Sequence, residues 1–266
     1  MTSFSQGIPQ LITSRDNPTL KLVKRLAQDN TAYRKEGKLW IEGEHLCSAA
    51  LARGVKPLLT LSTDSYWPRA PVAFVQACER HIVVPDALLK DISGLESPAP
   101  CGFVLALPQA LEIDPALPSV ILDGVQDAGN VGSILRSASA FGFKQVIAIK
   151  GSAALWSPKV VRSGMGAHFA LRLIESTSVE VVLKMQTPLA VTSSHRGQWL
   201  HEHAADNGRL QTVSWALGHE GQGVRPELEA SARWHVRIPQ PGGEESLNVA
   251  AAAAICLHAS AVDGLN

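Results

Sequence analysis

Residues 122–138 read LDGVQDAGNVGSILRSA, and within them an apolar run ends, a polar turn follows and a helical pattern begins. The apolar run is 120–122, and apolar residues then recur at Val131, Ile134, Leu135 and Ala138. This spacing predicts a strand followed by an amphipathic helix, with Asn130 as the helix N-cap. Because ligands of open α/β sheets bind where strands end in this way, the turn is a candidate site.

Two later segments have the same character. Residues 218–224 read GHEGQGV and follow an apolar run, so the backbone there can approach a ligand closely. Residues 238–249 read IPQPGGEESLNV and deliver Ser246 and Asn248 to the start of the last helical pattern. Each glycine loop alone is also typical of an ordinary turn between a strand and a helix.

The regions around these segments predict an α/β protein of two domains. Beyond residue 112 we expect strands separated mostly by helical patterns, which indicates a largely parallel sheet covered on both faces. The expected strands are 120–122, 146–149, 169–174, 189–192, 212–216 and 235–238. Three prolines within 108–118 mark a linker. We therefore place a first domain at 1–112 and a second at 113–266.

The first domain reads as a small α/β layer. An amphipathic helix is predicted over Pro18–Asp29, with Pro18 in its first turn. Strands are expected at 39–41, 58–61, 81–84 and 103–107, with helices at 44–53 and 86–92.

Composition excludes several protein classes. Hydrophobic residues make up 45% and charged residues 18%, which is enough apolar material for folded cores. No apolar stretch is long enough for a membrane span, and the first residues lack the pattern of a secretory signal, so we expect a cytoplasmic protein. The four cysteines, Cys47, Cys78, Cys101 and Cys256, form no CxxC pair, and we interpret them as buried free thiols.

Positive charge gathers near the N-terminus although the net charge is zero. Between residues 15 and 38, seven basic residues face three acids. This excess of four charges is typical of a solvated helix face, and it also fits a nucleic-acid surface. At the other end of the chain, the helix predicted over 248–262 is apolar nearly all round, so it is central in its domain or lies in a subunit interface.

Taken together, the ordered motifs NxGxxxRxAxxFG, GxExxG and IPxxGxxxSLNVAxA closely resemble those of the SpoU, or TrmH-like, family of SPOUT RNA methyltransferases. The resemblance covers the second domain, where 161–167 also looks like a connecting helix of that family. The first domain is similar, more weakly, to the family's substrate-binding domain through 12–14, 17–18, 34–37 and 40–43.

This resemblance implies an S-adenosylmethionine-dependent enzyme that forms 2'-O-methylribose in RNA, with ribosomal RNA favoured over transfer RNA. It implies a deep trefoil knot in the second domain and a homodimer paired through the knotted domains. Sequence patterning alone argues against a knot, because knots are nearly absent from protein folds. The resemblance also makes the basic cluster an RNA-facing surface, formed by Arg15, Lys21, Lys24, Arg25, Arg34 and Lys35.

By correspondence with the family, the catalytic residues are Arg136, Asn130, Glu220, Ser246 and Asn248, and the cofactor contacts are made by Gly218, Ile238 and Leu247. Arg136 is then the group nearest the proton transfer. An arginine is a poor general base, because its pKa lies above about 12. It could instead pair with a phosphate and stabilise developing alkoxide charge. Ser246 and Asn248 could equally serve as caps of the last helix.

Two histidine patterns are interpreted without a metal. His219 fits a loop residue better than a base. The segment His201-Glu202-His203 has no third ligand nearby in the sequence, so no metal site is predicted.

Other functions remain open at this stage. A catalytically silent RNA-binding relative is one, although all five catalytic positions are filled. A dinucleotide-dependent enzyme would require GxGxxG after the first strand of a βαβ unit, and that pattern is missing. The sequence does not name the RNA, the nucleotide or its base.

Overall fold

A computed structural model describes residues 8–193, 196–202, 210–242 and 246–262. The chain forms two compact units, the first made of residues 1–109 and 156–169 and the second of 110–155 and 170–266. Sequence analysis placed the boundary at 112, and it did not anticipate that 156–169 belongs with the first unit. Both units are α/β, as expected.

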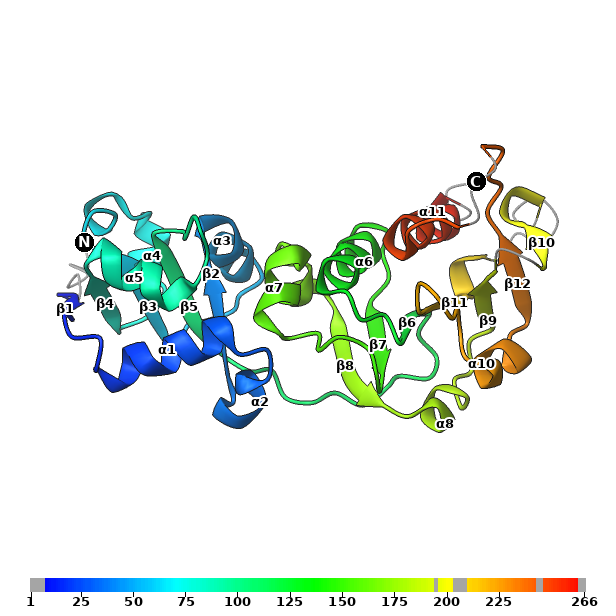
Figure 1. The fold of residues 1–266 in the computed structure, drawn as a ribbon, viewed down its shortest axis with the longest axis horizontal. Coiled ribbons are helices and arrows are strands. Elements are labelled where there is room, and N and C mark those ends of the chain that lie inside the picture. Colours follow the sequence, from blue (N-terminus) through cyan, green and yellow to red (C-terminus); the bar gives the residue numbers. More distant parts are fainter. Residues whose placement is uncertain (1–7, 194–195, 203–209, 243–245, 263–266) are drawn as a thin grey trace, which may run out of the picture. The chain divides into compact units, whose positions relative to one another are not determined.

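The first unit is a five-stranded mixed sheet with helices on it (Figure 1). Its elements are β1 Gln10–Leu11, α1 Pro18–Gln28, α2 Ala32–Glu36, β2 Lys38–Glu42, α3 Glu44–Ala52, β3 Leu59–Thr63, η1 Trp67–Arg69, α4 Val72–Val75, β4 His81–Val84, α5 Asp86–Ser93, β5 Cys101–Ala106 and α7 Pro158–Gly164, followed by the turn η2 Ala167–Ala170. The strand order is β1-β4-β3-β5-β2, in which β1, β4 and β3 are parallel and β5 is antiparallel to β3 and β2.

Helix α1 covers this sheet through the apolar stripe that its sequence predicts. Leu20, Val23 and Leu26 are buried in one cluster with residues of β3, β4 and α5. The Asn17 side chain accepts a hydrogen bond from the Thr19 N–H at 2.9 Å, which caps the helix start. Burying each large apolar side chain stabilises the unit by about 1.5–3 kcal/mol.

The second unit is a seven-stranded sheet in which every pairing is parallel. Its elements are β6 Ser119–Asp123, α6 Ala128–Ala140, β7 Gln145–Ile149, β8 Arg172–Thr177, α8 Val179–Val182, β9 Leu189–Thr192, β10 Gln198–Trp199, η3 Leu210–Thr212, β11 Ser214–Gly218, α10 Pro226–Ser231, β12 Trp234–Arg237 and α11 Val249–Val262. The strand order is β10-β12-β9-β11-β6-β7-β8.

Helices cover both faces of this sheet, as the apolar strands predict. On one face, Val179, Val182 and Leu228 of α8 and α10 pack on Ile121 and Ala216. On the other face, α6 and α11 lie side by side (Figure 1). The Nε1–H of Trp215 in β11 donates to the Ser260 Oγ of α11 at 2.9 Å, which fixes α11 on its strand.

One predicted strand begins three residues too early. Sequence analysis expected a strand at 169–174, whereas β8 is Arg172–Thr177 and residues before it form the turn η2. The pairing with β7 sets where β8 begins, because Gln145 at the start of β7 aligns with Arg172. Phe169 belongs to the segment that packs with the first unit.

The cysteines are free, as predicted, but not all are buried. Cys47, Cys101 and Cys256 are buried and Cys78 is half-buried. Burial raises the pKa of the Cys256 thiol to about 12, so it stays protonated and unreactive at neutral pH.

Candidate functional site

The candidate site forms where two neighbouring parallel strands end together. Gly218, the last residue of β11, is aligned with Asp123, the last residue of β6. The turn that enters α6 and the loop after β11 therefore leave the sheet side by side. This brings together the first two sequence motifs, which are about 90 residues apart in the chain.

The start of α6 differs from the prediction. The N-cap is Asp127, whose Oδ1 accepts a hydrogen bond from the Asn130 backbone N–H at 2.7 Å, so the helix begins at Ala128. Predicting Asn130 as the cap was wrong, because an aspartate three residues earlier fills that role equally well. The Asn130 side-chain amide is therefore left free for other partners.

That amide links all three motifs through hydrogen bonds. Asn248 Nδ2 donates to Asn130 Oδ1 at 3.0 Å, and Asn130 Nδ2 donates to Glu220 Oε1. Asn248 Oδ1 also accepts from the N–H groups of Ala250 and Ala251, so this residue caps α11 as well. Each amide has one orientation that satisfies these bonds, and the Asn248–Asn130–Glu220 chain is thereby fixed in direction.

The loop that carries Glu220 is closed on itself. His219 and Gly223 exchange two backbone hydrogen bonds, of 3.0 and 2.8 Å. A Cβ atom on Gly218 would lie 2.1 Å from the Gly223 carbonyl carbon, so only glycine fits there. The His219 Nδ1 accepts the Gly221 N–H at 3.0 Å, which occupies one of the two ring nitrogens and braces the loop.

A cavity of about 900 Å³ lies beside this loop, at the carboxyl ends of β9, β11 and β12. Among the predicted residues, Ile238, Leu247, Glu220 and Ser246 line it. Gly218 is not a lining residue and acts by letting the loop close. Sequence analysis missed Gln240, which also lines the cavity and whose buried Oε1 has no hydrogen-bond partner among the described residues.

Arg136 lies apart from the cavity lining. It is exposed on α6, six residues after Asn130, which places it about 9 Å further along the helix and about 120° around its axis. Within the described part of the chain it has no ion pair or hydrogen bond. The structure therefore brings together four of the five predicted catalytic residues and leaves Arg136 on an open surface.

Half of the basic cluster is paired with acids. Lys21 pairs with Asp16 at 2.8 Å, Lys24 pairs with Asp91 at 2.8 Å, and Arg25 pairs with Glu36. Asp91 lies on α5, far from the cluster in sequence, so the local count of charges overstated the excess. Arg15, Arg34 and Lys35 are exposed and form no ion pair with any residue that the structure describes.

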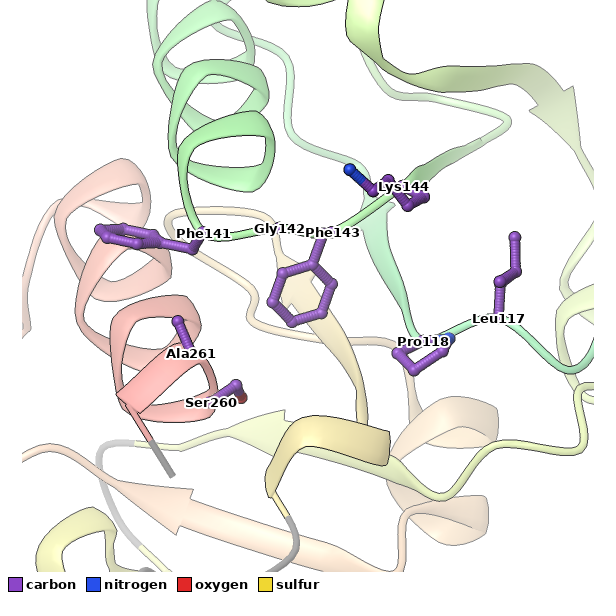
Figure 2. A pocket seen from close by; sticks show the side chains of 8 residues that line it. All are labelled: Leu117, Pro118, Phe141, Gly142, Phe143, Lys144, Ser260 and Ala261. Atoms are coloured by element: carbon purple, nitrogen blue, oxygen red, sulfur yellow. The ribbon is translucent and has the colours of Figure 1, made fainter. Parts of the chain in front are cut away.

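A second pocket lies at the opposite edge of the same sheet, before β6 and β7 begin. Figure 2 shows the Phe143 ring projecting into it between Pro118 and Ala261. Its volume is about 280 Å³, and the Ser260 hydroxyl within it is already bonded to Trp215. Ligands of open α/β sheets bind at the carboxyl ends of strands, which favours the larger cavity as the functional one.

The prediction about metals is tested only in part. His203 lies outside the described residues, as do Gly243, Glu244 and Glu245 of the third motif. Among the residues with described positions, no group of three or more metal-ligating side chains is close enough to hold an ion. No helix in that part of the chain is long and apolar enough to cross a membrane.

Curated relatives match most of the chain. An uncharacterized tRNA/rRNA methyltransferase of Synechocystis is 33% identical over 93% of this chain and 92% of its own. The 23S rRNA (guanosine(2553)-2'-O)-methyltransferase RlmP of Bacillus subtilis is 28% identical over 93% of this chain and 97% of its own. By contrast, the match to human mitochondrial rRNA methyltransferase 3 covers 61% of this chain and only 41% of that protein.

Solved structures share the whole fold. A putative RNA methyltransferase of the TrmH family from Porphyromonas gingivalis is 30% identical, with a TM-score of 0.77 over 91% of this chain and 96% of its own. An AdoMet-bound rRNA methyltransferase from Sinorhizobium meliloti, 23% identical, has the same fold with a TM-score of 0.82 over 97% and 99%. The SpoU rRNA Methylase family model matches residues 118–258, the span that holds the three motifs and the cavity. The chain therefore belongs to the SpoU rRNA methylase family.

Proposed function

We propose that this protein transfers a methyl group from S-adenosylmethionine to the 2'-hydroxyl of a ribose in ribosomal RNA. The observation that carries the proposal is the Asn248–Asn130–Glu220 hydrogen-bond chain, which joins three distant motifs beside one cavity. The relatives named as rRNA methyltransferases support the substrate class. Transfer RNA is the second candidate, which the Synechocystis relative's name also includes.

The cavity suits this cofactor chemically. Leu247 and Ile238 supply apolar surface for a flat heterocycle, and the unpartnered Gln240 Oε1 can accept a hydrogen bond from an amino group. Backbone groups of the 219–224 loop also line it. When bound, the cofactor supplies a methyl group that its sulfonium already activates.

The residues of the chain then have to orient a ribose hydroxyl and manage its proton. Glu220 uses Oε1 to accept from Asn130, which leaves its other oxygen to accept from a substrate hydroxyl. Arg136 either takes the proton or, as its high pKa favours, pairs with a neighbouring phosphate and stabilises the developing negative charge. Its exposed position on α6 suits contact with RNA.

The trefoil knot is also proposed for this chain. Strand β11 lies between β9 and β6, both of which precede it in the chain. Residues after β12, which lies between β10 and β9, return to pack α11 against α6 and β11. Such a return path is what threading of the last segment through an earlier loop requires.

The first unit is proposed to bind RNA through its basic cluster. Within that cluster, the residues without an ion pair should contribute most to binding. Charge reversal at Arg15, Arg34 and Lys35 together should weaken RNA binding more than reversal at Lys21, Lys24 and Arg25, because the second set is already paired with acids. Each lost phosphate contact lowers the logarithmic salt slope by about 0.7–0.9. Salt titrations of RNA affinity for the two triple variants measure this.

Cofactor affinity, measured alongside, should be unchanged in both variants. If RNA affinity and its salt slope were equal in wild type and in both variants, the basic cluster would be an ordinary solvated surface without a role in RNA binding. RNA recognition would then have to come from the surface around Arg136.

We further propose a homodimer formed through α11. Val249, Ala253 and Leu257 of α11 are buried, whereas Ile255 and Val262 of the same helix are 40% and 39% exposed. Light scattering at micromolar concentration should give twice the chain mass of 28.4 kDa. Ile255→Glu should shift the mass toward the monomer, because association would bury an unpaired charge. Val181→Glu, at a residue 42% exposed on α8, is the control and should stay dimeric. A wild-type protein that is monomeric and active would contradict the proposal.

Two experiments test the function itself. Ribose methylation is mapped in total RNA from cells with and without the gene, and a methyl that is missing from one rRNA nucleotide without the gene is the expected result. The full-length protein with labelled S-adenosylmethionine should then restore that methyl in vitro. A fragment of 113–266 is unsuitable, because it would carry residues 156–169 without the unit that covers them. A methyl that is lost only from transfer RNA would identify transfer RNA as the substrate. No lost methyl in any RNA would favour a catalytically silent relative.

A further inference from the structure

A charged pair that sequence analysis did not identify closes the loop of the second motif. Asp123 ends β6, and its side chain is only 4% exposed. Arg225 binds it with three groups. The backbone N–H donates to Oδ2 at 2.7 Å, Nε donates to Oδ1 at 2.7 Å, and a terminal guanidinium nitrogen lies 2.6 Å from the same oxygen.

The two residues join the ends of the loop to the two central strands. Residues 219–225 leave β11 at Gly218, which is aligned with Asp123, and the Asp123–Arg225 pair ties their far end to the neighbouring strand. Between these points the backbone is closed by the His219–Gly223 bonds. Glu220 lies at the turn between these two points, where its side chain accepts a hydrogen bond from Asn130.

Charge and burial show that this pair is a strong restraint. A carboxylate that is almost fully buried must have its oxygens satisfied, and Arg225 serves both of them. Asp123 in turn raises the pKa of the Arg225 guanidinium through their hydrogen bond, so the guanidinium keeps its positive charge. Lysine in place of Arg225 could not make the same paired contacts, because it lacks the planar fork.

We propose that Asp123 and Arg225 are positioning residues, which hold the 219–225 loop so that Glu220 stays bonded to Asn130. Neither residue lines the cavity, so they act through Glu220 rather than on a bound molecule. The effect on turnover rests on the proposed methyl transfer. The effect on the loop does not.

The most informative variant is the double substitution Asp123→Asn with Arg225→Gln. It removes both charges together, leaves no unpaired buried ion and keeps polar groups at both positions. Arg225→Lys is the second variant, and it tests the fork while keeping the charge. Arg196→Gln is the matched control, because Arg196 pairs with Glu229 of α10, the helix that Arg225 caps, whereas Arg225 pairs with Asp123.

Hydrogen exchange in the full-length protein tests the loop independently of any reaction. The Gly223 amide, which bonds to the His219 carbonyl, should exchange at least about 10-fold faster in the double variant and in Arg225→Lys. It should be unchanged in Arg196→Gln. Equal protection in wild type and in both loop variants would overturn the inference, whether or not the protein proves to be a methyltransferase.

Turnover tests the link to Glu220. With saturating S-adenosylmethionine and ribosomal RNA from cells lacking the gene, the double variant should lose about 30-fold in kcat, on the scale of a misplaced catalytic group. The same change made in a Glu220→Gln background should cost less than about threefold, because the residue that it positions is already disabled. Losses that multiply independently would overturn the positioning role. An inactive wild type would instead refute the proposed function, and the exchange result would still decide the loop.

Discussion

Replacing Arg136 by alanine should reduce the methylation rate at least about 100-fold and leave the affinity for S-adenosylmethionine unchanged. The two effects separate because Arg136 does not line the cavity, so its loss removes no contact to the cofactor. The rate should fall because no other cation of α6 can replace Arg136 in its proposed contact with RNA: Arg136 is the only basic residue between Ala128 and Ala140. Single-turnover rates and calorimetric Kd values measure the two quantities.

Two further variants make this result specific. Arg136→Lys should recover little activity, because lysine is a point charge without the planar fork that matches phosphate. Arg233→Ala removes an exposed arginine from the same unit at the start of β12, and should keep the full rate. An Arg136→Ala protein with wild-type rate would show that neither role of Arg136 holds and that Glu220 and its partners suffice.

The residues of the site could be predicted from sequence better than their contacts. Glycines, Asn130, Glu220 and Asn248 stand at strand ends that helical patterns follow, so they were expected at the ligand-binding edge. The order of the strands decides which ends are neighbours, and periodicity does not contain that order. The alignment of Gly218 with Asp123 brings the loop that carries Glu220 next to the turn that carries Asn130.

The residue types around the start of α6 do not decide which residue is the N-cap. Asp127 and Asn130 are both good N-caps, and the choice between them shifts the helix by one turn. The hydrogen bonds of the site decide between them, because an Asn130 amide used for capping could not also bridge Glu220 and Asn248. The same reasoning shows that Asn248 can serve both roles, since capping uses its oxygen and the bridge uses its nitrogen.

The other features that the sequence does not predict depend on contacts between residues far apart in the chain. Asp91 neutralises Lys24 from another helix, and Asp123 holds Arg225 across 102 positions of the chain. Asp91 lies within a helical pattern and Asp123 follows an apolar run, and no local pattern marks either as half of an ion pair. Residues 156–169 were placed in the second domain because they continue its motif order, yet they pack with the first unit.

Leu247→Asp should abolish measurable binding of S-adenosylmethionine, with at least about a 100-fold loss of affinity, or about 2.7 kcal/mol. Leu247 is 37% exposed and lines the cavity, where a bound molecule would cover it. An aspartate there would have to lose its hydration when the ligand binds, with no lysine or arginine among the cavity-lining residues to compensate its charge. Calorimetry on the full-length protein measures the loss.

Controls separate this effect from general damage to the unit. Val181→Asp places the same charge at a residue 42% exposed on α8, away from the cavity, and should bind normally. Leu247→Ala removes only apolar contact and should weaken binding about 10-fold, a loss within the range for an apolar side chain. Since Leu247 adjoins Asn248, the melting temperature of each variant shows whether the α11 cap survives. If the Leu247→Asp protein melts normally and binds S-adenosylmethionine within threefold of the wild-type affinity, the cofactor does not bind in this cavity.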